Sequence, residues 1–200
     1  MTRPSRIGLF GGSFNPVHFG HLIMAEHARA QLGLDRVLFA PAGNPPHKAG
    51  QQLASISDRL EMVQLAIASN DVLVCSDLDI DEAEPSFTWR LLERLRDAHP
   101  GANLWFIMGG DSLAEFHTWA RPERIVELAR LAVVERPGYS LDGDRLPSVE
   151  AFRNHVDLID APLCARSSTE IRDRVKARTT VRYLIPEAVR SYIDDRDLYR

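Results

Sequence analysis

Short, unbroken apolar runs alternate along the chain with longer segments in which apolar residues recur every three or four positions. The first pattern is typical of buried β-strands, and the second is typical of amphipathic helices. We predict strands at Arg6–Phe10, Arg36–Pro41, Asn103–Gly109 and His155–Ile159, within Val72–Ile80, and at the start of Arg130–Gly138. We predict helices at His21–Gly33 with Gly33 as C-cap, at 58–69 capped by Ser57, from a Ser86 cap to about His99, at Ser167–Ala177, and at Pro186–Asp195.

Repeated strand–helix units with apolar strands predict an α/β fold built on a parallel sheet. Right-handed crossovers place helices on both faces, which gives a Rossmann-like, doubly wound sheet. The 200 residues suit one domain, so we assign 1–200 to a single domain in which 164–200 form a small helical C-terminal part. In such a sheet, ligands bind at the carboxyl ends of the strands, where the strand order reverses.

Charge and composition narrow the classes of function. The net charge of −4 argues against a protein whose main role is to grip nucleic acid, but it leaves room for a local basic pocket. No apolar run approaches the length of a membrane span, and the first residues lack the core of a signal peptide. Cys75 and Cys164 lack metal or redox spacing, so we interpret them as reduced, buried thiols of a cytoplasmic protein. The oligomeric state stays open, a homo-oligomer included.

Two glycines and two histidines follow the first predicted strand. Gly11 and Gly12 fit neither the dinucleotide-binding pattern nor the P-loop pattern, but they allow the backbone to approach a ligand closely. A helix that begins near Pro16–Val17 places His18 and His21 on one face, beside main-chain N–H groups that attract anions. Two interpretations stay open here, a phosphate site or ordinary capping and packing. Zinc is weakly supported because no third ligand lies nearby.

The segment Gly11–Leu22, GGSFNPVHFGHL, resembles the (H/T)xGH signature of the nucleotidylyltransferase superfamily, with His18 and His21 as its histidines. Enzymes of this superfamily transfer a nucleotidyl group through its α-phosphorus to a phosphate or acid acceptor and release pyrophosphate. The resemblance implies that both histidines contact the triphosphate and stabilise the transition state. It assigns further ATP contacts in this loop to Gly11, Gly12, Ser13 and Phe14.

A second segment with candidate chemistry, SSTEIR, lies near the end of the chain at Ser167–Arg172. Serine at a helix start followed by Glu170 is also an ordinary capping signature, but capping does not explain Arg172. The segment resembles the superfamily's second signature, ISSTxIR, except that Arg166 replaces the leading isoleucine. The resemblance assigns contacts with the β- and γ-phosphates to Ser167, Ser168, Thr169 and Arg172.

Further segments resemble one branch of the superfamily, the nicotinate mononucleotide adenylyltransferases. They are NPPHK at Asn44–Lys48, PSFT at Pro85–Thr88, GGDSLAEFHTW at Gly109–Trp119 and RPG at Arg136–Gly138. Phe87 stands where the branch usually has tyrosine. The resemblance implies ATP contacts for Gly109 and Asp111, and mononucleotide contacts for Lys48, Ser86, Thr88, Trp119 and Arg136.

Taken singly, several of these residues have ordinary alternatives. Lys48 fits a solvated loop, Asp111 fits a helix cap, and Trp119 fits an aromatic core. The resemblance implies instead that Trp119 stacks on the pyridine ring of the acceptor. It also implies that the helix start at Ser86 and Thr88 binds the nicotinate carboxylate.

Together the signatures predict adenylyl transfer from ATP to nicotinate mononucleotide, which forms deamido-NAD and pyrophosphate in NAD biosynthesis. Mg²⁺ is expected to bridge the ATP phosphates through water, because no clustered carboxylates would hold it directly, and we assign no metal ligand. Neither nucleic acid nor a membrane is an expected partner. The alternatives are another adenylyl- or cytidylyltransferase of the superfamily, such as the pantetheine-phosphate type, and a catalytically silent nucleotide sensor. Composition does not decide between nicotinate and nicotinamide, although the carboxylate-binding helix start favours nicotinate.

Overall fold

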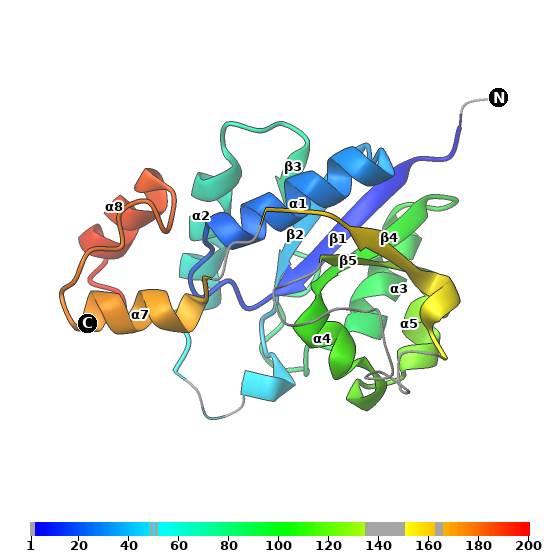
Figure 1. Ribbon diagram of the computed structural model, residues 1–200. Coiled ribbons are helices and arrows are strands. Elements are labelled where there is room, and N and C mark those ends of the chain that lie inside the picture. Colours follow the sequence, from blue (N-terminus) through cyan, green and yellow to red (C-terminus); the bar gives the residue numbers. More distant parts are fainter. Residues whose placement is uncertain (1–2, 49, 51, 135–150, 163–165) are drawn as a thin grey trace.

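The centre of the molecule is a six-stranded parallel sheet with the strand order β3-β2-β1-β4-β5-β6 (Figure 1). The computed structural model describes residues 3–48, 50, 52–134, 151–162 and 166–200. The strands are β1 (Arg6–Gly12), β2 (Arg36–Pro41), β3 (Leu73–Cys75), β4 (Asn103–Gly109), β5 (Arg130–Val134) and β6 (Val156–Ile159). The predicted α/β, Rossmann-like fold and its strands are therefore confirmed. The order reverses between β1 and β4, so the expected ligand site lies at the carboxyl ends of these strands.

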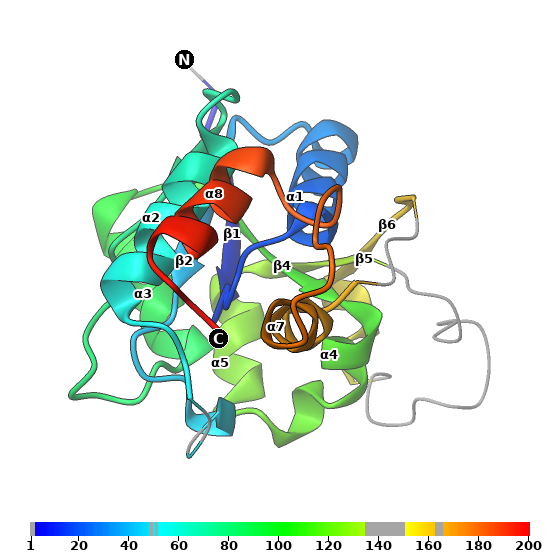
Figure 2. The same cartoon turned by 90° about the vertical axis from the view of Figure 1, so that its left-hand side faces the viewer.

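Helices pack on both faces of the sheet, as predicted (Figure 2). One core contains α1 (Phe19–Leu32), α2 (Ile56–Ile67), α7 (Ser168–Lys176) and α8 (Glu187–Asp195), and the other contains α3 (Thr88–Ala98), α4 (Gly110–Ala114) and α5 (Pro122–Leu128). Strand side chains alternate between the two cores. Phe10 and Ile107 face the first core, whereas Leu9 and Phe106 face the second. Short 3₁₀ turns occupy Pro46–Lys48, Phe116–Thr118 and Arg153–His155.

The helix ends follow local capping chemistry, which the sequence predicts only in part. Gly33 ends α1 with a φ of 59°, a left-handed value that favours glycine, so the predicted C-cap is confirmed. The predicted Ser57 cap of α2 is wrong, because Ser55 Oγ accepts the Asp58 N–H at 3.1 Å and the helix begins at residue 56. Pro186, predicted as the first residue of the last helix, is instead the N-cap of α8, which begins one residue later. The short helix α5 is missing from the sequence prediction.

The C-terminal segment returns to the ligand side of the sheet. In Figure 1, α7 and α8 lie together at one end of the molecule, and α8 packs against α2. The Asp58 carboxylate is buried at this contact, where it accepts hydrogen bonds from the Tyr192 hydroxyl at 2.9 Å and from Arg196 at 3.2 Å. The main-chain N–H of Phe19 donates to the Leu184 carbonyl at 3.2 Å. These contacts join the chain end to the starts of α1 and α2.

Cys75 is a half-buried free thiol, as predicted, and its burial raises its pKa to about 11. A thiol of this pKa is a poor nucleophile at neutral pH. Cys164 lies outside the described residues. In the part of the chain that the structure describes, no helix combines the length and apolar character that crossing a membrane requires.

Candidate active site

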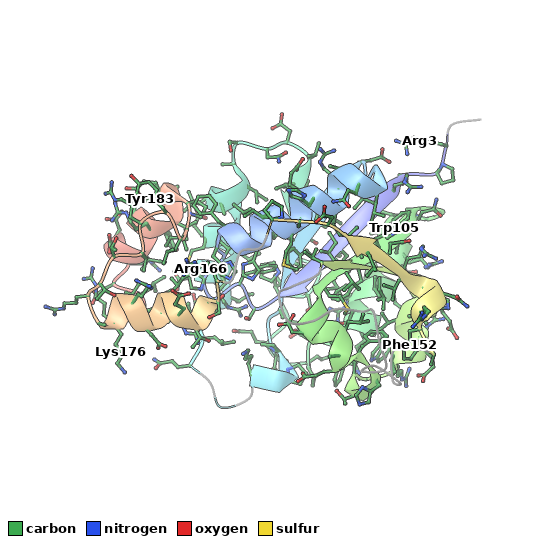
Figure 3. The ribbon with its side chains drawn as sticks, viewed as in Figure 1. Arg3, Trp105, Phe152, Arg166, Lys176 and Tyr183 are labelled. Atoms are coloured by element: carbon green, nitrogen blue, oxygen red, sulfur yellow. The ribbon has the colours of Figure 1, made fainter. Side chains whose placement is uncertain are left out.

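A cavity of about 270 Å³ opens at the carboxyl ends of β1 and β4, between the first loop and the start of α7. It brings together many of the predicted site residues: Ser13, His18, His21, Lys48, Asp111, Ser167, Ser168, Thr169 and Arg172. Its other lining residues are Asn15, Leu53 and Arg166, none of which is a predicted contact. Figure 3 shows Arg166 where the chain enters α7. Two segments that are far apart in the sequence thus share one cavity.

Three residues of the predicted first loop support it without lining the cavity. The Phe14 ring is 1% exposed and meets Phe10 edge-on at a centroid distance of 5.5 Å. A Cβ atom on Gly12 would lie 3.3 Å from the Phe14 ring, so glycine allows this ring to pack close to the end of β1. Gly11, Gly12 and Phe14 can therefore offer a ligand only their main chain.

His18 and His21 lie side by side on the cavity wall. The predicted helix start near Pro16–Val17 is wrong, because α1 begins at Phe19 and His18 is its N-cap. The His18 main-chain N–H donates to His21 Nδ1 at 3.2 Å, and the two rings stack with centroids 3.7 Å apart. Since Nδ1 of neutral His21 accepts a hydrogen bond, its proton is on Nε2, which becomes the donor of the ring. The histidines are thus both capping residues and cavity residues.

Helix α7 is attached directly to the first loop. Ser168 Oγ donates to the Pro16 carbonyl at 2.8 Å, across 152 positions of sequence. Arg172 donates to the Asn15 carbonyl at 2.8 Å and to Thr169 Oγ1 at 3.2 Å. Ser167 is the N-cap and accepts the N–H of residue 170 at 3.1 Å, so the capping interpretation holds for this serine. The contacts of Ser168 and Arg172 explain why the two motifs meet.

Asn15 is a cavity residue that the sequence prediction missed. Its side chain is 1% exposed, and its Oδ1 accepts hydrogen bonds from the Ala54 N–H at 3.0 Å and from the Tyr199 hydroxyl at 2.8 Å. These bonds fix the amide orientation. Nδ2 of Asn15 is buried and has no hydrogen-bond partner within the described residues, in a residue that lines the cavity. The sequence shows an asparagine in a glycine-rich loop, but it does not show the two partners that orient it.

Lys48 and Asp111 reach the cavity from the segments that follow β2 and β4. Lys48 lies in the 3₁₀ turn that follows β2, and Asp111 lies in the first turn of α4, directly after β4. The N-cap of α4 is Gly109, so the capping alternative for Asp111 is wrong. Both residues occupy the ligand side of the sheet.

The predicted contacts with the mononucleotide lie mostly outside this cavity. The predicted Ser86 cap of α3 is wrong, because Ser86 Oγ accepts the Asn44 N–H at 3.1 Å and Phe87 is the N-cap. Thr88 is the first residue of α3. Trp119 is half-buried and packs against Phe116 at a centroid distance of 5.5 Å. Gly109, a predicted ATP contact, also lies outside the cavity lining, and Arg136 lies outside the described residues.

The loops after β2 and β3 are held together main chain to main chain. The Gly43 N–H donates to the Asp79 carbonyl at 2.7 Å, and a Cβ atom on Gly43 would lie 2.7 Å from the carbonyl of Ile80. Asp79 is 6% exposed, and burial raises the pKa of its carboxyl to about 6 against the opposing effects of a hydrogen bond from Ser86 and the charge of Arg94. Because Ser86 also binds the loop after β2, these loops form one connected support beside the cavity.

The chain matches a family model and is similar to curated proteins described as probable nicotinate-nucleotide adenylyltransferases. Residues 9–174 match the family model described as cytidylyltransferase-like. A probable nicotinate-nucleotide adenylyltransferase of Thermomicrobium roseum is 44% identical over 197 residues, which cover 98% of this chain and 92% of the relative. A protein of the same description from Desulfitobacterium hafniense strain DCB-2 is 41% identical over 201 residues, which cover 98% of this chain and 97% of the relative.

A solved structure with a similar fold comes from Plasmodium falciparum. The nicotinic acid mononucleotide adenylyltransferase of Plasmodium falciparum, complexed with NaAD, aligns with a TM-score of 0.82 and covers 98% of this chain and 97% of that chain. The same protein complexed with APC aligns with a TM-score of 0.80. Sequence identity is 20% in both cases, so this likeness concerns the fold.

Proposed function

Because the chain belongs to the cytidylyltransferase-like family and, within it, to the nicotinate-nucleotide adenylyltransferases, we propose that it transfers the adenylyl group of ATP to nicotinate mononucleotide. A 5′-phosphate oxygen of the mononucleotide attacks the α-phosphorus of ATP. The bond from that phosphorus to the oxygen that bridges to the β-phosphate breaks, and pyrophosphate leaves with the bonding electrons. The products are deamido-NAD and pyrophosphate. The observation that carries the proposal is the single cavity that joins the paired histidines to the start of α7.

The cavity offers a donor set suited to a triphosphate. Lys48, Arg166 and Arg172 supply positive charge, whereas Asp111 is the one carboxylate among the lining residues that the structure describes. Fixed donors aimed at developing negative charge lower the barrier of phosphoryl transfer, because they need no reorganisation during the reaction. We assign the phosphates to these cations together with the hydroxyls of 167–169 and the Asn15 amide.

The histidines stabilise charge in this mechanism and do not take part in a covalent step. The attacking phosphate is already anionic, so the reaction needs neither a protein nucleophile nor a general base. Because Nδ1 of His21 accepts the His18 N–H, we assign Nε2 as the atom of this ring that donates to a phosphate oxygen. We assign His18, His21 and Arg172 to the transferring and leaving phosphates.

Mg²⁺ enters the proposal as part of the ATP substrate complex. Within the described residues, no group of three or more His, Cys, Asp or Glu side chains is placed to hold a metal ion. Asp111 is the cavity carboxylate with the hard oxygen ligands that Mg²⁺ prefers. When bound, the ion would neutralise phosphate charge, and we assign it no direct protein ligand.

The nicotinate end of the acceptor is assigned to the start of α3. The N-cap Phe87 makes no side-chain capping bond, so main-chain N–H groups of the first turn are available for a carboxylate. Ser86 fixes the approach to this helix start through its hydrogen bond with the Asn44 N–H. We keep Thr88, Trp119 and Arg136 in the proposed mononucleotide site, and we place the activity in the cytoplasm.

The test is a side-by-side assay with nicotinate and nicotinamide mononucleotide. Purified protein is given ATP, Mg²⁺ and either acceptor, and pyrophosphate release and dinucleotide formation are measured together. We expect kcat/KM to be about tenfold or more higher for nicotinate, because nicotinamide leaves a carboxylate site unfilled. Equal values would remove the carboxylate site from the proposal. Binding of ATP without turnover over a panel of mononucleotides would favour a silent sensor instead.

A further inference from the structure

Arg59, on α2, is a buried cation that forms no ion pair with a described carboxylate. Its side chain is 1% exposed, and no carboxylate among the described residues forms an ion pair with it. A buried charge is costly unless other groups compensate it. Main-chain carbonyls provide partial compensation, and the guanidinium donates to Ala54 at 3.0 Å, Ser13 at 3.0 Å, Ala42 at 2.7 Å and Gly43 at 3.4 Å.

These four carbonyls belong to loops that build the proposed triphosphate site. Ser13 follows β1 and lines the cavity, whereas Ala42 and Gly43 directly follow β2. Ala54 precedes α2, and its N–H holds the Oδ1 of Asn15. One guanidinium therefore fixes the chain at the carboxyl ends of two neighbouring strands and at the residue that orients the Asn15 amide.

The charge of Arg59 is only partly offset next to the cavity, because the Glu82 carboxylate favours the charged form from a distance without forming an ion pair with it. Carbonyl dipoles stabilise a guanidinium but carry no net charge. Burial lowers the pKa of Arg59 from its ordinary value, yet an arginine stays protonated at neutral pH. Its field acts through protein and not through bulk water, so screening is weak. Ser13, whose carbonyl accepts a hydrogen bond from Arg59, lines the cavity in which the highly anionic triphosphate would lie.

We propose that Arg59 is a positioning residue for ATP. Its hydrogen bonds fix the loops after β1 and β2, and its buried positive charge, next to the cavity, is neutralised by the bound triphosphate. The inference rests on the proposed function, since it assumes that the cavity binds the triphosphate. It differs from the assigned phosphate contacts because Arg59 does not line the cavity. The negative charge of the bound triphosphate thus compensates positive charge of Arg59 that the free protein does not pair with a carboxylate.

The test compares Arg59→Lys, which keeps the charge, with Arg59→Gln, which removes it. We expect Arg59→Gln to raise the KM for ATP about tenfold or more while the KM for nicotinate mononucleotide changes less than about threefold. Arg59→Lys should keep the KM for ATP within about threefold of wild type. The matched control is Arg124→Gln on α5, where the arginine pairs with Glu93 at 2.9 Å and should leave both constants unchanged.

Two outcomes overturn the inference while the proposed function stands. One is a folded Arg59→Gln variant whose KM for ATP equals that of wild type. The other is an equal rise in both KM values, whether or not lysine restores them, which would indicate a merely structural role. A wild-type protein that does not form deamido-NAD would instead overturn the proposed function itself.

A measurement on the wild-type protein applies even if Arg59→Gln does not fold. The Nε–H of a buried arginine exchanges slowly with water and can be followed by ¹⁵N NMR, with Arg59→Lys as the variant that assigns the signal. Inorganic tripolyphosphate, at saturation established by calorimetry, should shift this signal, and nicotinate mononucleotide alone should not. A signal that does not move at saturating tripolyphosphate contradicts the proposal.

Discussion

Replacement of Asp79 by asparagine tests the electrostatics of the loops beside the site. Asp79 is 6% exposed at the end of the segment that follows β3, and Arg94 lies 3.7 Å from its carboxylate. Burial raises the pKa of this carboxyl from 3.8 to about 6, although a hydrogen bond from Ser86 and the charge of Arg94 act in the opposite direction. Ionised Asp79 therefore destabilises the fold at neutral pH.

The magnitude follows from this change of pKa. Above pH 6 the group is ionised in both the folded and the unfolded chain, and the fold bears a cost of about 3 kcal/mol. As the pH falls through 6, the folded chain binds a proton that the unfolded chain does not yet bind, so the cost is relieved. Below pH 4 both states are neutral. Asp79→Asn removes the ionisation but weakens the hydrogen bond and ion pair of this side chain. We therefore expect the free energy of unfolding to rise by about 2 kcal/mol at pH 8 and not to rise at pH 4.

The assay is urea unfolding of wild type and Asp79→Asn at pH 8, 6 and 4. Asp71→Asn, at an exposed carboxylate just before β3, controls for the general effect of removing one negative charge. A stability difference for Asp79→Asn that is the same at all three pH values would refute the reasoning. So would a loss of stability at pH 8, because it would mean that the ionised form is the favoured one.

Four further substitutions test contacts around the site. Tyr199→Phe removes one of the two bonds that orient the Asn15 amide, so calorimetric titration should show ATP binding weakened about fivefold with little change in fold stability. Gly43→Ala places a Cβ atom 2.7 Å from the main chain after β3, and urea unfolding should show a loss of about 2 kcal/mol or more. Ser55→Ala should cost about 1 kcal/mol in the same measurement and Ser57→Ala less than about 0.5, whereas the reverse order would mean that the cap is misassigned.

The strands were predictable because buried parallel strands are unbroken apolar runs. β2 and β4 have the predicted bounds, and β1 extends the predicted strand to Gly12. Helix starts were less predictable, because two serines near α2 both satisfy the local capping rule and only the folded chain selects Ser55. The helix α5 spans seven residues, which is too short for a clear periodic pattern.

The cavity residues were predictable where a motif carries them in one short segment. The histidines and the start of α7 were found in this way, and the structure places them together. Asn15 and Arg59 were not found, because their significance depends on distant contacts. Tyr199 is 184 positions from Asn15, and the carbonyls that hold Arg59 come from two connections, β1–α1 and β2–α2. Nothing in the local sequence distinguishes Arg59 from a surface arginine.

The central claim is that the paired histidines stabilise the transferring phosphates, and pyrophosphate release by His18→Ala and His21→Ala tests it most directly. Loss of one fixed donor to a charged transition state typically costs about 10²–10³ in kcat, so we expect a loss of this size in each variant. His27→Ala is the matched control, since His27 lies on the same helix and contacts the Asp160 carbonyl at 3.1 Å, away from the cavity. We predict that His27→Ala retains wild-type turnover. Near wild-type turnover by folded His18→Ala and His21→Ala variants would contradict the account.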